Sequence, residues 1–391
     1  DGIHLRPLRN VQDANNVLET LSGNASPLVS LVNAVANNTI LPLSRMADPS
    51  QLPTQASSAS GSGGFLGSLT GSAPAGAAQQ AASGAQNTAA QSALSQLGPF
   101  SRWPGSAIAE PFQSLQDLVV SRNNSQPGIT DVQQTIVNLY SAVNLISTAP
   151  DIGKAAFDEV KSRIDNPRNS PITAVSTASV SQPSPVQEIM SDLASQTWSV
   201  LLDEAQSYLD AQWQQTVVRE CQRAIFQRYP AYRDAKTETA VTDFARFFAP
   251  TGTMATFFSN YLEPFVDTSS TPWKTRTVDG KGLKISAQTL QAFANARIIA
   301  DAFFPNNAPT PTVSFTLRPS FLDSNAARIA IDASGGIFTY RHEPPRDLQL
   351  TWPATGGTDK VSVTITDLKG ASTSYTANGP WAWFRLFDKF G

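Results

Sequence analysis

The sequence predicts an α+β protein, in which an elongated multi-helix region is followed by a small C-terminal antiparallel β-sandwich-like domain. Two observations predict this class. Through most of the first 305 residues, apolar side chains recur at helical spacing, as they do from Leu193 to Trp213. Beyond that point, apolar and polar residues alternate in short runs. A period of two places one face of each strand in a core and the other face in water.

Composition divides the 391 residues into four predicted segments. Residues 1–47 are expected to form an N-terminal helical segment that packs with the helical region, and residues 48–98 a linker rich in Ser, Ala and Gly. Residues 99–305 are predicted to be a helical domain, and residues 306–391 a β domain with a terminal helix. The 48–98 segment has too few large apolar residues to offset the entropy of ordering it.

The N-terminal segment predicts two helices joined by a turn. Ser26 is expected to cap the second helix, and Pro27 suits its first position because that position needs no hydrogen-bond donor. Farther along, the longest predicted helix or helix pair runs from Leu193 to Ile225. Cys221 is expected to be a buried residue of this helix, since free cysteine is among the most buried residue types.

The segment that follows the long helix is dense in aromatic residues. Pro250 and Gly252 are expected to separate two short helices, whose aromatic side chains hold them to the main bundle or to the β domain. A last helix, capped by Ser286, is predicted to end at Phe304. The prolines beginning at Pro305 end this helix and open the β domain.

Four runs with a period of two predict strands at residues 313–318, 328–332, 348–352 and 361–366, and a further strand is expected from Ile337 to Arg341. Trp352 is in phase with the apolar positions of its strand, so it is predicted to lie in the core. Trp381 and Phe384 fit a short amphipathic helix that packs on the sheet. Trp383 would then lie on a different face of that helix, which makes it the predicted exposed aromatic residue.

The charge pattern excludes nucleic acid as a partner. The net charge is −3, from 28 basic and 31 acidic residues, and no basic block is present. Binding to phosphates requires a concentrated positive stripe. The charged fraction of 15% is low, compared with about 25% in soluble domains. A polar but weakly charged surface is common outside the cytoplasm.

The sequence has no run of 18 or more apolar residues, so we expect no bilayer-spanning segment in it. It begins at Asp1 without Met or a signal peptide. The chain is therefore expected to be a fragment or a mature piece, with any membrane anchor upstream.

Residue types that carry catalysis are scarce. The histidines are His4 and His342, and Cys221 is the lone cysteine. A strand-end structural role is favoured for His342, and Cys221 has no basic cluster that would activate its thiol. Neither a nucleophile elbow nor metal-ligand spacing is present. We therefore expect no enzyme, no metal and no cofactor.

A second hypothesis from the residues is a peptidoglycan- or glycan-binding envelope module without catalysis. Such a module would use exposed aromatic side chains on the β domain, and the candidates are Tyr340, Trp352, Tyr375, Trp381 and Trp383. Core packing is the favoured interpretation for most of them. Trp383 is the residue that best fits this alternative.

Four groups of residues, taken in order, carry a resemblance to a known family. They are Leu21-Ser22-Gly23 with Ser26-Pro27-Leu28; Phe247-Phe248 with Pro250, Phe257-Phe258 and Pro264-Phe265-Val266-Asp267; Phe293 with Phe303-Phe304; and Tyr340-Arg341-His342 with Trp352-Pro353 and Gly379-Pro380-Trp381-Ala382. Their order and spacing resemble the periplasmic C-terminal region of the IcmF (TssM) family, the core protein of the type VI secretion membrane complex. Glu343 and Ala354 stand where the family pattern has glycine.

The resemblance implies a non-enzymatic scaffold, namely the periplasmic portion of an inner-membrane-anchored protein whose anchor is absent from this chain. It implies that the C-terminal β domain binds a small outer-membrane lipoprotein (TssJ-like), which would link the inner membrane to the outer membrane. It also implies a TssL-like inner-membrane partner and self-association into a ring-like oligomer.

The tip of the β domain is the predicted partner-binding surface, because exposed strand edges and loops are ready docking surfaces. The predicted contact residues are Tyr340, His342, Trp352, Ala354, Thr355, Thr358, Lys360 and Trp383.

Overall fold

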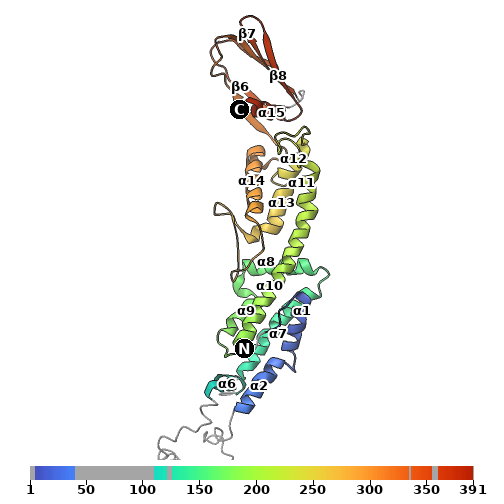
Figure 1. Cartoon of the computed structure of the whole chain (residues 1–391), viewed down its shortest axis with the longest axis vertical. Coiled ribbons are helices and arrows are strands. Elements are labelled where there is room, and N and C mark those ends of the chain that lie inside the picture. The colour runs from blue at the N-terminus through green and yellow to red at the C-terminus, as the bar shows by residue number, and fades with distance from the viewer. Residues whose placement is uncertain (1–4, 40–109, 121–125, 334–335, 355–359, 391) are drawn as a thin grey trace, which may run out of the picture. The chain divides into compact units, whose positions relative to one another are not determined.

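The structure is a computed structural model that describes residues 5–39, 110–120, 126–333, 336–354 and 360–390 (Figure 1). The predicted linker, residues 48–98, lies outside the described residues. The chain divides into two compact units. The first unit comprises Asp1–Pro7, Gln12–Asn144 and Ala174–Ser195, and the second comprises Leu8–Val11, Leu145–Thr173 and Gln196–Gly391. The four segment boundaries expected from composition stay a prediction.

The first unit is helical throughout its described elements. These are α1 (Val11–Ser22), α2 (Pro27–Thr39), α6 (Gln113–Val119) after the 3-10 turn Glu110–Phe112, most of α7 (Gly128–Ser147) and most of α9 (Pro171–Ser179), together with the start of α10. The predicted N-terminal pair of helices is confirmed, with Pro27 at the first helical position. Their apolar faces are buried, as at Leu18, Val32 and Ile136.

The predicted cap of α2 is wrong. The Ser26 hydroxyl is buried and has no hydrogen-bond partner among the described residues. It therefore accepts no bond from the first N–H groups of α2. The backbone supplies the first contact instead, since the Ser30 N–H donates to the Ser26 carbonyl at 2.9 Å.

The second unit contains a long, nearly continuous helix. It is made of the larger part of α10 (Val186–Trp213), the π-helical turn Gln214–Val218 and α11 (Arg219–Ala224), which follow one another in Figure 1. This confirms the predicted long helix or helix pair. Cys221 is half-buried, not buried as expected.

The remaining helices of the second unit are α8 (Ile152–Asp165) with the turn Pro167–Asn169, α12 (Val241–Phe248), α13 (Thr253–Phe257), the π-helical turn Phe258–Leu262, the turn Glu263–Phe265, α14 (Ala287–Phe303) and the turn Pro305–Asn307. Among them, α8 and α14 are long, with 14 and 17 residues, and the others are short. A two-stranded ribbon of β1 (Val266–Asp267) and β2 (Lys274–Thr275) precedes α14.

Two local predictions about these helices are confirmed. Pro250 and Gly252 separate α12 from α13, and a Cβ atom at Gly252 would lie 2.8 Å from the backbone oxygen of Arg246. A side chain would clash there, so the turn requires glycine. The Ser286 hydroxyl accepts a hydrogen bond from the Thr289 N–H at 3.0 Å and caps α14.

The β region follows, and its described residues form six strands and a terminal helix. Its elements are β3 (Val313–Leu317), β4 (Ala326–Ala333), β5 (Gly336–Tyr340), β6 (Leu348–Trp352), β7 (Lys360–Asp367), β8 (Ser372–Asn378) and α15 (Ala382–Phe390). One sheet has the order β5-β4-β7-β8, and β3 pairs with β6 in a second sheet; all pairs are antiparallel. The predicted α+β class is confirmed.

The β region and the adjoining helices share one apolar core. It contains Trp352 and Trp381 from the β region together with Phe244 and Phe304 from α12 and the end of α14. The Trp352 and Trp381 rings lie 4.5 Å apart between centroids, and Phe244 approaches Trp381 at 5.0 Å. The core placement predicted for these two tryptophans is therefore confirmed.

Candidate functional site

Two parts of the β region could carry its function: the contact with the helical region and the exposed faces of its sheets. The contact is formed by polar groups around the shared core. The Trp381 indole N–H donates to the Thr239 carbonyl at 2.6 Å, and the Trp352 indole N–H donates to the Pro380 carbonyl at 2.5 Å. Both indole N–H groups are thus satisfied in a mostly apolar environment, as buried donors must be.

An ion pair and a cation–π contact, both made by Arg385, complete the contact between the β region and the helical region. Arg385 of α15 donates to Glu238 at 2.6 Å, and its guanidinium lies 4.0 Å from the centre of the Tyr229 ring. The Tyr229 hydroxyl in turn donates to Asp388 at 2.8 Å. Burial, followed by the hydrogen bond to Asp388, raises the pKa of the Tyr229 phenol. Tyr229 therefore stays a neutral donor.

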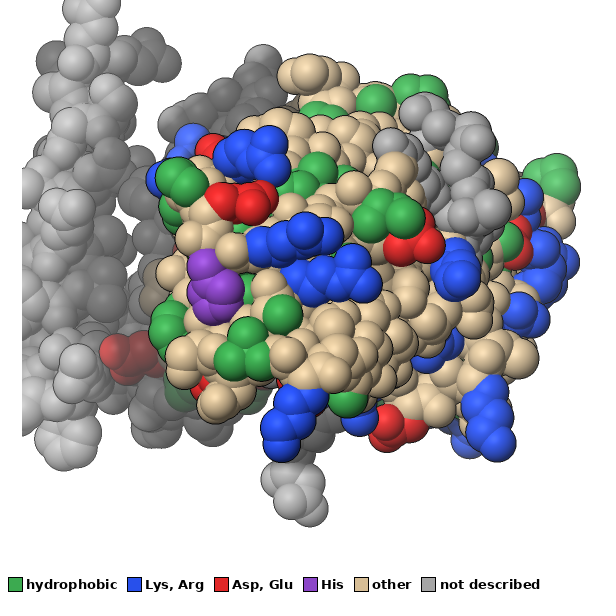
Figure 2. All heavy atoms as spheres, turned by 90° about the horizontal axis from the view of Figure 1, so that it is seen from above, with side chains coloured by type: hydrophobic (Ala, Val, Ile, Leu, Met, Phe, Trp, Pro, Cys, Tyr) green, Lys and Arg blue, Asp and Glu red, His purple; other side chains and the backbone are tan. Residues whose placement is uncertain are grey.

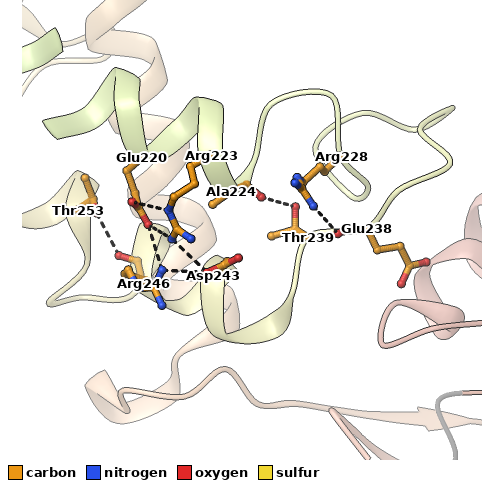
Figure 3. A network of polar contacts seen from close by, with 9 residues as sticks. All are labelled: Glu220, Arg223, Ala224, Arg228, Glu238, Thr239, Asp243, Arg246 and Thr253. Atoms are coloured by element: carbon orange, nitrogen blue, oxygen red, sulfur yellow. Dashed lines mark hydrogen bonds and ion pairs between the residues drawn. The ribbon is translucent and has the colours of Figure 1, made fainter. Parts of the chain in front are cut away.

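The segment that carries Tyr229, Glu238 and Thr239 is held by its own contacts (Figure 3). The buried Thr239 hydroxyl donates to the Ala224 carbonyl at 3.0 Å, and Arg228 donates to the Glu238 carbonyl at 3.5 Å. This segment joins α11 to α12. It presents a fixed backbone to the β region.

Helices α11 and α12 are themselves joined by ion pairs. In Figure 3, Glu220 and Arg223 of α11 point toward Asp243 and Arg246 of α12. Arg223 pairs with Glu220 at 2.6 Å and with Asp243 at 3.2 Å, and Arg246 pairs with the same two acids at 3.4 and 2.9 Å. The hydrogen bond from Arg223 lowers the pKa of Glu220. Each of these four side chains is paired with a side chain of opposite charge, so we assign them a role in joining the two helices.

The residues predicted for partner binding lie in three settings. Tyr340, Trp352 and Trp383 are buried. His342 and Lys360 are exposed, and Ala354 is half-buried. Thr355 and Thr358 lie outside the described residues. Partner contact by these eight residues stays a prediction.

The predicted exposure of Trp383 is wrong. Its side chain is only 6% exposed, because its ring packs edge-on against Phe315 at 5.3 Å and stacks on Phe387 at 5.9 Å. Trp381, directly before α15, is thus buried against the helical region and β6, and Trp383, within α15, is buried against β3. An exposed aromatic platform at Trp383, which the glycan-binding alternative requires, is absent.

His342 has a structural role in the β region. Its backbone adopts a left-handed conformation, with φ of 65°, and its Nε2 atom lies 2.8 Å from the Ala326 carbonyl oxygen. The ring thereby ties the turn after β5 to the start of β4. This agrees with the strand-end role favoured by the sequence.

The outer face of the four-stranded sheet is lined with hydroxyl groups. Cross-strand hydrogen bonds of 2.8–3.0 Å join Ser362 with Thr376, Thr364 with Ser374 and Thr366 with Ser372. Arg328 donates to Thr366 at 3.2 Å on the same face. The alternation within residues 328–332 places Arg328 on the face of β4 opposite its apolar side chains, but Arg328 is not among the predicted contact residues.

No reactive constellation is visible in the described ranges. Three or more His, Cys, Asp or Glu side chains do not gather there as a metal site. Burial raises the pKa of the Cys221 thiol, the opposite of what activates a nucleophile. None of the described helices combines the length and apolar character that crossing a membrane requires.

Comparison with known proteins gives matches along most of the chain. A family model for the type VI secretion protein IcmF helical domain matches residues 204–308, and one for the IcmF C2-like domain matches residues 315–391. The type VI secretion system component TssM1 of Pseudomonas aeruginosa is 29% identical over 387 residues, which cover 98% of this chain and 33% of TssM1. The chain therefore spans about a third of the length of that relative.

Two solved structures share the fold. One, a type VI secretion system membrane core complex, has a TM-score of 0.66 at 18% identity and is matched over 98% of this chain and 68% of its own. The other, a type VI membrane complex, has a TM-score of 0.64 at 16% identity over 98% and 65% of the two chains.

The described residues thus define a class: an α+β protein in which a helical region is joined through a shared core to a C2-like antiparallel β region. Residues 204–308 and 315–391 match the helical and C2-like domains of the type VI secretion protein IcmF, and nearly the whole chain is similar to TssM1. The resemblance found in the sequence is confirmed.

Proposed function

We propose that this chain is a scaffold of a type VI secretion membrane complex that docks an outer-membrane lipoprotein through its C2-like domain. The observation that carries the proposal is the match to TssM1 over 98% of this chain, with the helical and C2-like domains in the same chain. The proposal includes a periplasmic location, a non-enzymatic role, a TssL-like inner-membrane partner and a ring-like oligomer.

Physical features of the C2-like domain support docking. Both end strands of the four-stranded sheet, β5 and β8, have one edge without a paired strand among the described residues. Exposed edges and loops offer backbone donors and acceptors to a partner. Because the contact with the helical region is largely buried and shares one apolar core, load applied to the C2-like domain would pass to α11, α12 and α14.

Hydrogen exchange on the full chain tests this proposal. A soluble, lipid-free form of the type VI outer-membrane lipoprotein from the same organism would be added to the chain at increasing concentration. On addition of the lipoprotein, amide hydrogens in residues 313–378 are expected to exchange more slowly, and those in the helices from 128 to 303 are expected to exchange at an unchanged rate. Protection confined to the helices would overturn docking through the C2-like domain, and the absence of any binding would overturn docking altogether.

A further inference from the structure

Two arginines of the C2-like domain lie at the same end of neighbouring strands, Arg328 within β4 and Arg341 directly after β5. β4 and β5 pair in a register that ends at Ile329 and Tyr340. Arg328 precedes Ile329 and Arg341 follows Tyr340, so continuing this register by one step sets the two arginines opposite each other. Arg328 is paired with Thr366 and lies on the face of the sheet opposite the core. The contact between His342 and the Ala326 carbonyl holds the chain after β5 beside β4 at this point. Figure 2 shows Lys and Arg side chains gathered on this end of the domain, with a histidine beside them.

No acid neutralises the pair within the described ranges. Neither guanidinium forms an ion pair there, whereas Arg318 pairs with Asp347 at 3.7 Å and Arg346 with Glu343 at 3.1 Å. Asp367, which ends β7 next to this site, accepts the backbone N–H groups of Lys369 and Ala371. Like charges opposite one another on adjacent strands destabilise a sheet. An anion bound between the two would remove that repulsion.

The surroundings suit a protein ligand. The Thr366 hydroxyl orients Arg328 from the neighbouring strand. Leu368, in the turn after β7, is 69% exposed, and its N–H donates to the Asn325 carbonyl at 3.1 Å, which places it beside the start of β4. Arginine is enriched in protein interfaces and among the residues that contribute most to their binding energy.

We infer that Arg328 and Arg341 form a recognition site for a carboxylate on an acidic segment of a partner protein. This rests on the proposed function, since that partner is the docked lipoprotein. A membrane surface is the weaker ligand, because polybasic lipid-binding segments typically have about 4–8 basic residues, more than this pair and the neighbouring Lys369 supply. Each guanidinium can hold a carboxylate through two parallel hydrogen bonds.

The test measures binding of the soluble lipoprotein to the full chain by calorimetry. Arg341→Gln and Arg328→Gln are each expected to weaken binding about tenfold or more, and the double variant should also reduce the dependence of the dissociation constant on salt. Arg341→Lys, which keeps the charge and loses the paired hydrogen bonds, should give an intermediate loss. The matched control is Arg318→Gln, in the same domain, which should bind as the wild type does.

Folding is checked by thermal unfolding, in which Arg341→Gln should melt no lower than the wild type because a repulsion has been removed. Wild-type affinity in the double variant would overturn this inference while leaving the proposed function intact. A wild-type chain that does not bind the lipoprotein would overturn both. A parallel experiment measures binding to vesicles of phosphatidylethanolamine and phosphatidylglycerol. If the double variant loses vesicle binding but still binds the lipoprotein as the wild type does, the choice of a protein ligand is overturned.

Discussion

At the scale of single residues, the contact between the helical and C2-like domains depends on Arg385. Its side chain is 24% exposed and that of its partner Glu238 is 15% exposed. The face of the guanidinium is covered by the Tyr229 ring. A mostly buried charge is costly to leave unpaired, because the protein interior solvates ions poorly. Glu238 should therefore matter more to stability than acids in the exposed ion pairs of this chain.

We predict that Glu238→Gln lowers the free energy of unfolding by about 2 kcal/mol. The amide keeps the size of the side chain but leaves the Arg385 guanidinium without its counter-charge. The measurement is urea unfolding followed by tryptophan fluorescence. Asp203→Asn is the matched control, since Asp203 and Lys284 are 70% and 79% exposed, and it should change stability by less than about 0.5 kcal/mol. Equal losses in the two variants would contradict the prediction.

Glu220 should make stability depend on pH. Its hydrogen bond from Arg223 lowers its pKa below the ordinary value of 4.5. The stabilisation from the ionised carboxylate is therefore complete above the unfolded pKa and is lost as pH falls through the lower folded pKa. Urea midpoints measured from pH 6 down to pH 3 should fall more steeply for the wild type than for Glu220→Gln. If the urea midpoints of the two proteins fall in parallel as pH is lowered, the pairing of Glu220 with Arg223 contributes nothing to the pH dependence of stability.

At the scale of elements, the starts of two helices give a direct comparison. Ser286 caps α14 through its hydroxyl, whereas the hydroxyl of Ser26, before α2, is buried without a partner among the described residues. The same substitution should thus have different effects. Ser286→Ala should cost about 1 kcal/mol of unfolding free energy. Ser26→Ala should be close to neutral, since it removes an unsatisfied polar group. Chemical denaturation measures both, and a larger loss at Ser26 would be inconsistent with this assignment.

The elements that sequence analysis predicted well are those with strong local signals. Periodic apolar residues gave the long helix, and Pro250 with Gly252 gave the break between α12 and α13. Strand β8 has no such signal, because its sequence, Ser372–Asn378, is almost entirely polar. It is a strand because β7 supplies its hydrogen bonds and hydroxyl partners.

The site was less predictable than the fold, because its contacts join distant parts of the chain. Arg385 and Glu238 are 147 residues apart, and no local pattern relates them. The exposure expected for Trp383 failed because β3, which covers it, lies far away in sequence. Arg328 and Arg341 could have been found from strand alternation once the pairing of β4 with β5 was known.

At the scale of the second compact unit, the helical and C2-like domains should unfold together. Trp381 is completely buried between Phe244, Trp352 and Phe384, and its indole N–H bonds to Thr239. It is therefore part of the core of both domains. Replacing it would leave a cavity that neither side can close alone.

Hydrogen exchange on the full chain tests this coupling. Trp381→Ala should cost about 3–5 kcal/mol of unfolding free energy, and it should speed exchange in residues 226–248 as well as in strands β6 to β8. The reason is that the cavity removes apolar contacts from α12 and from the sheet at once. Phe321→Ala, at a side chain that is 81% exposed, should leave both regions protected. Faster exchange in the strands alone would mean that the two domains are independent, and that force applied to the C2-like domain is not passed to the helices through this core.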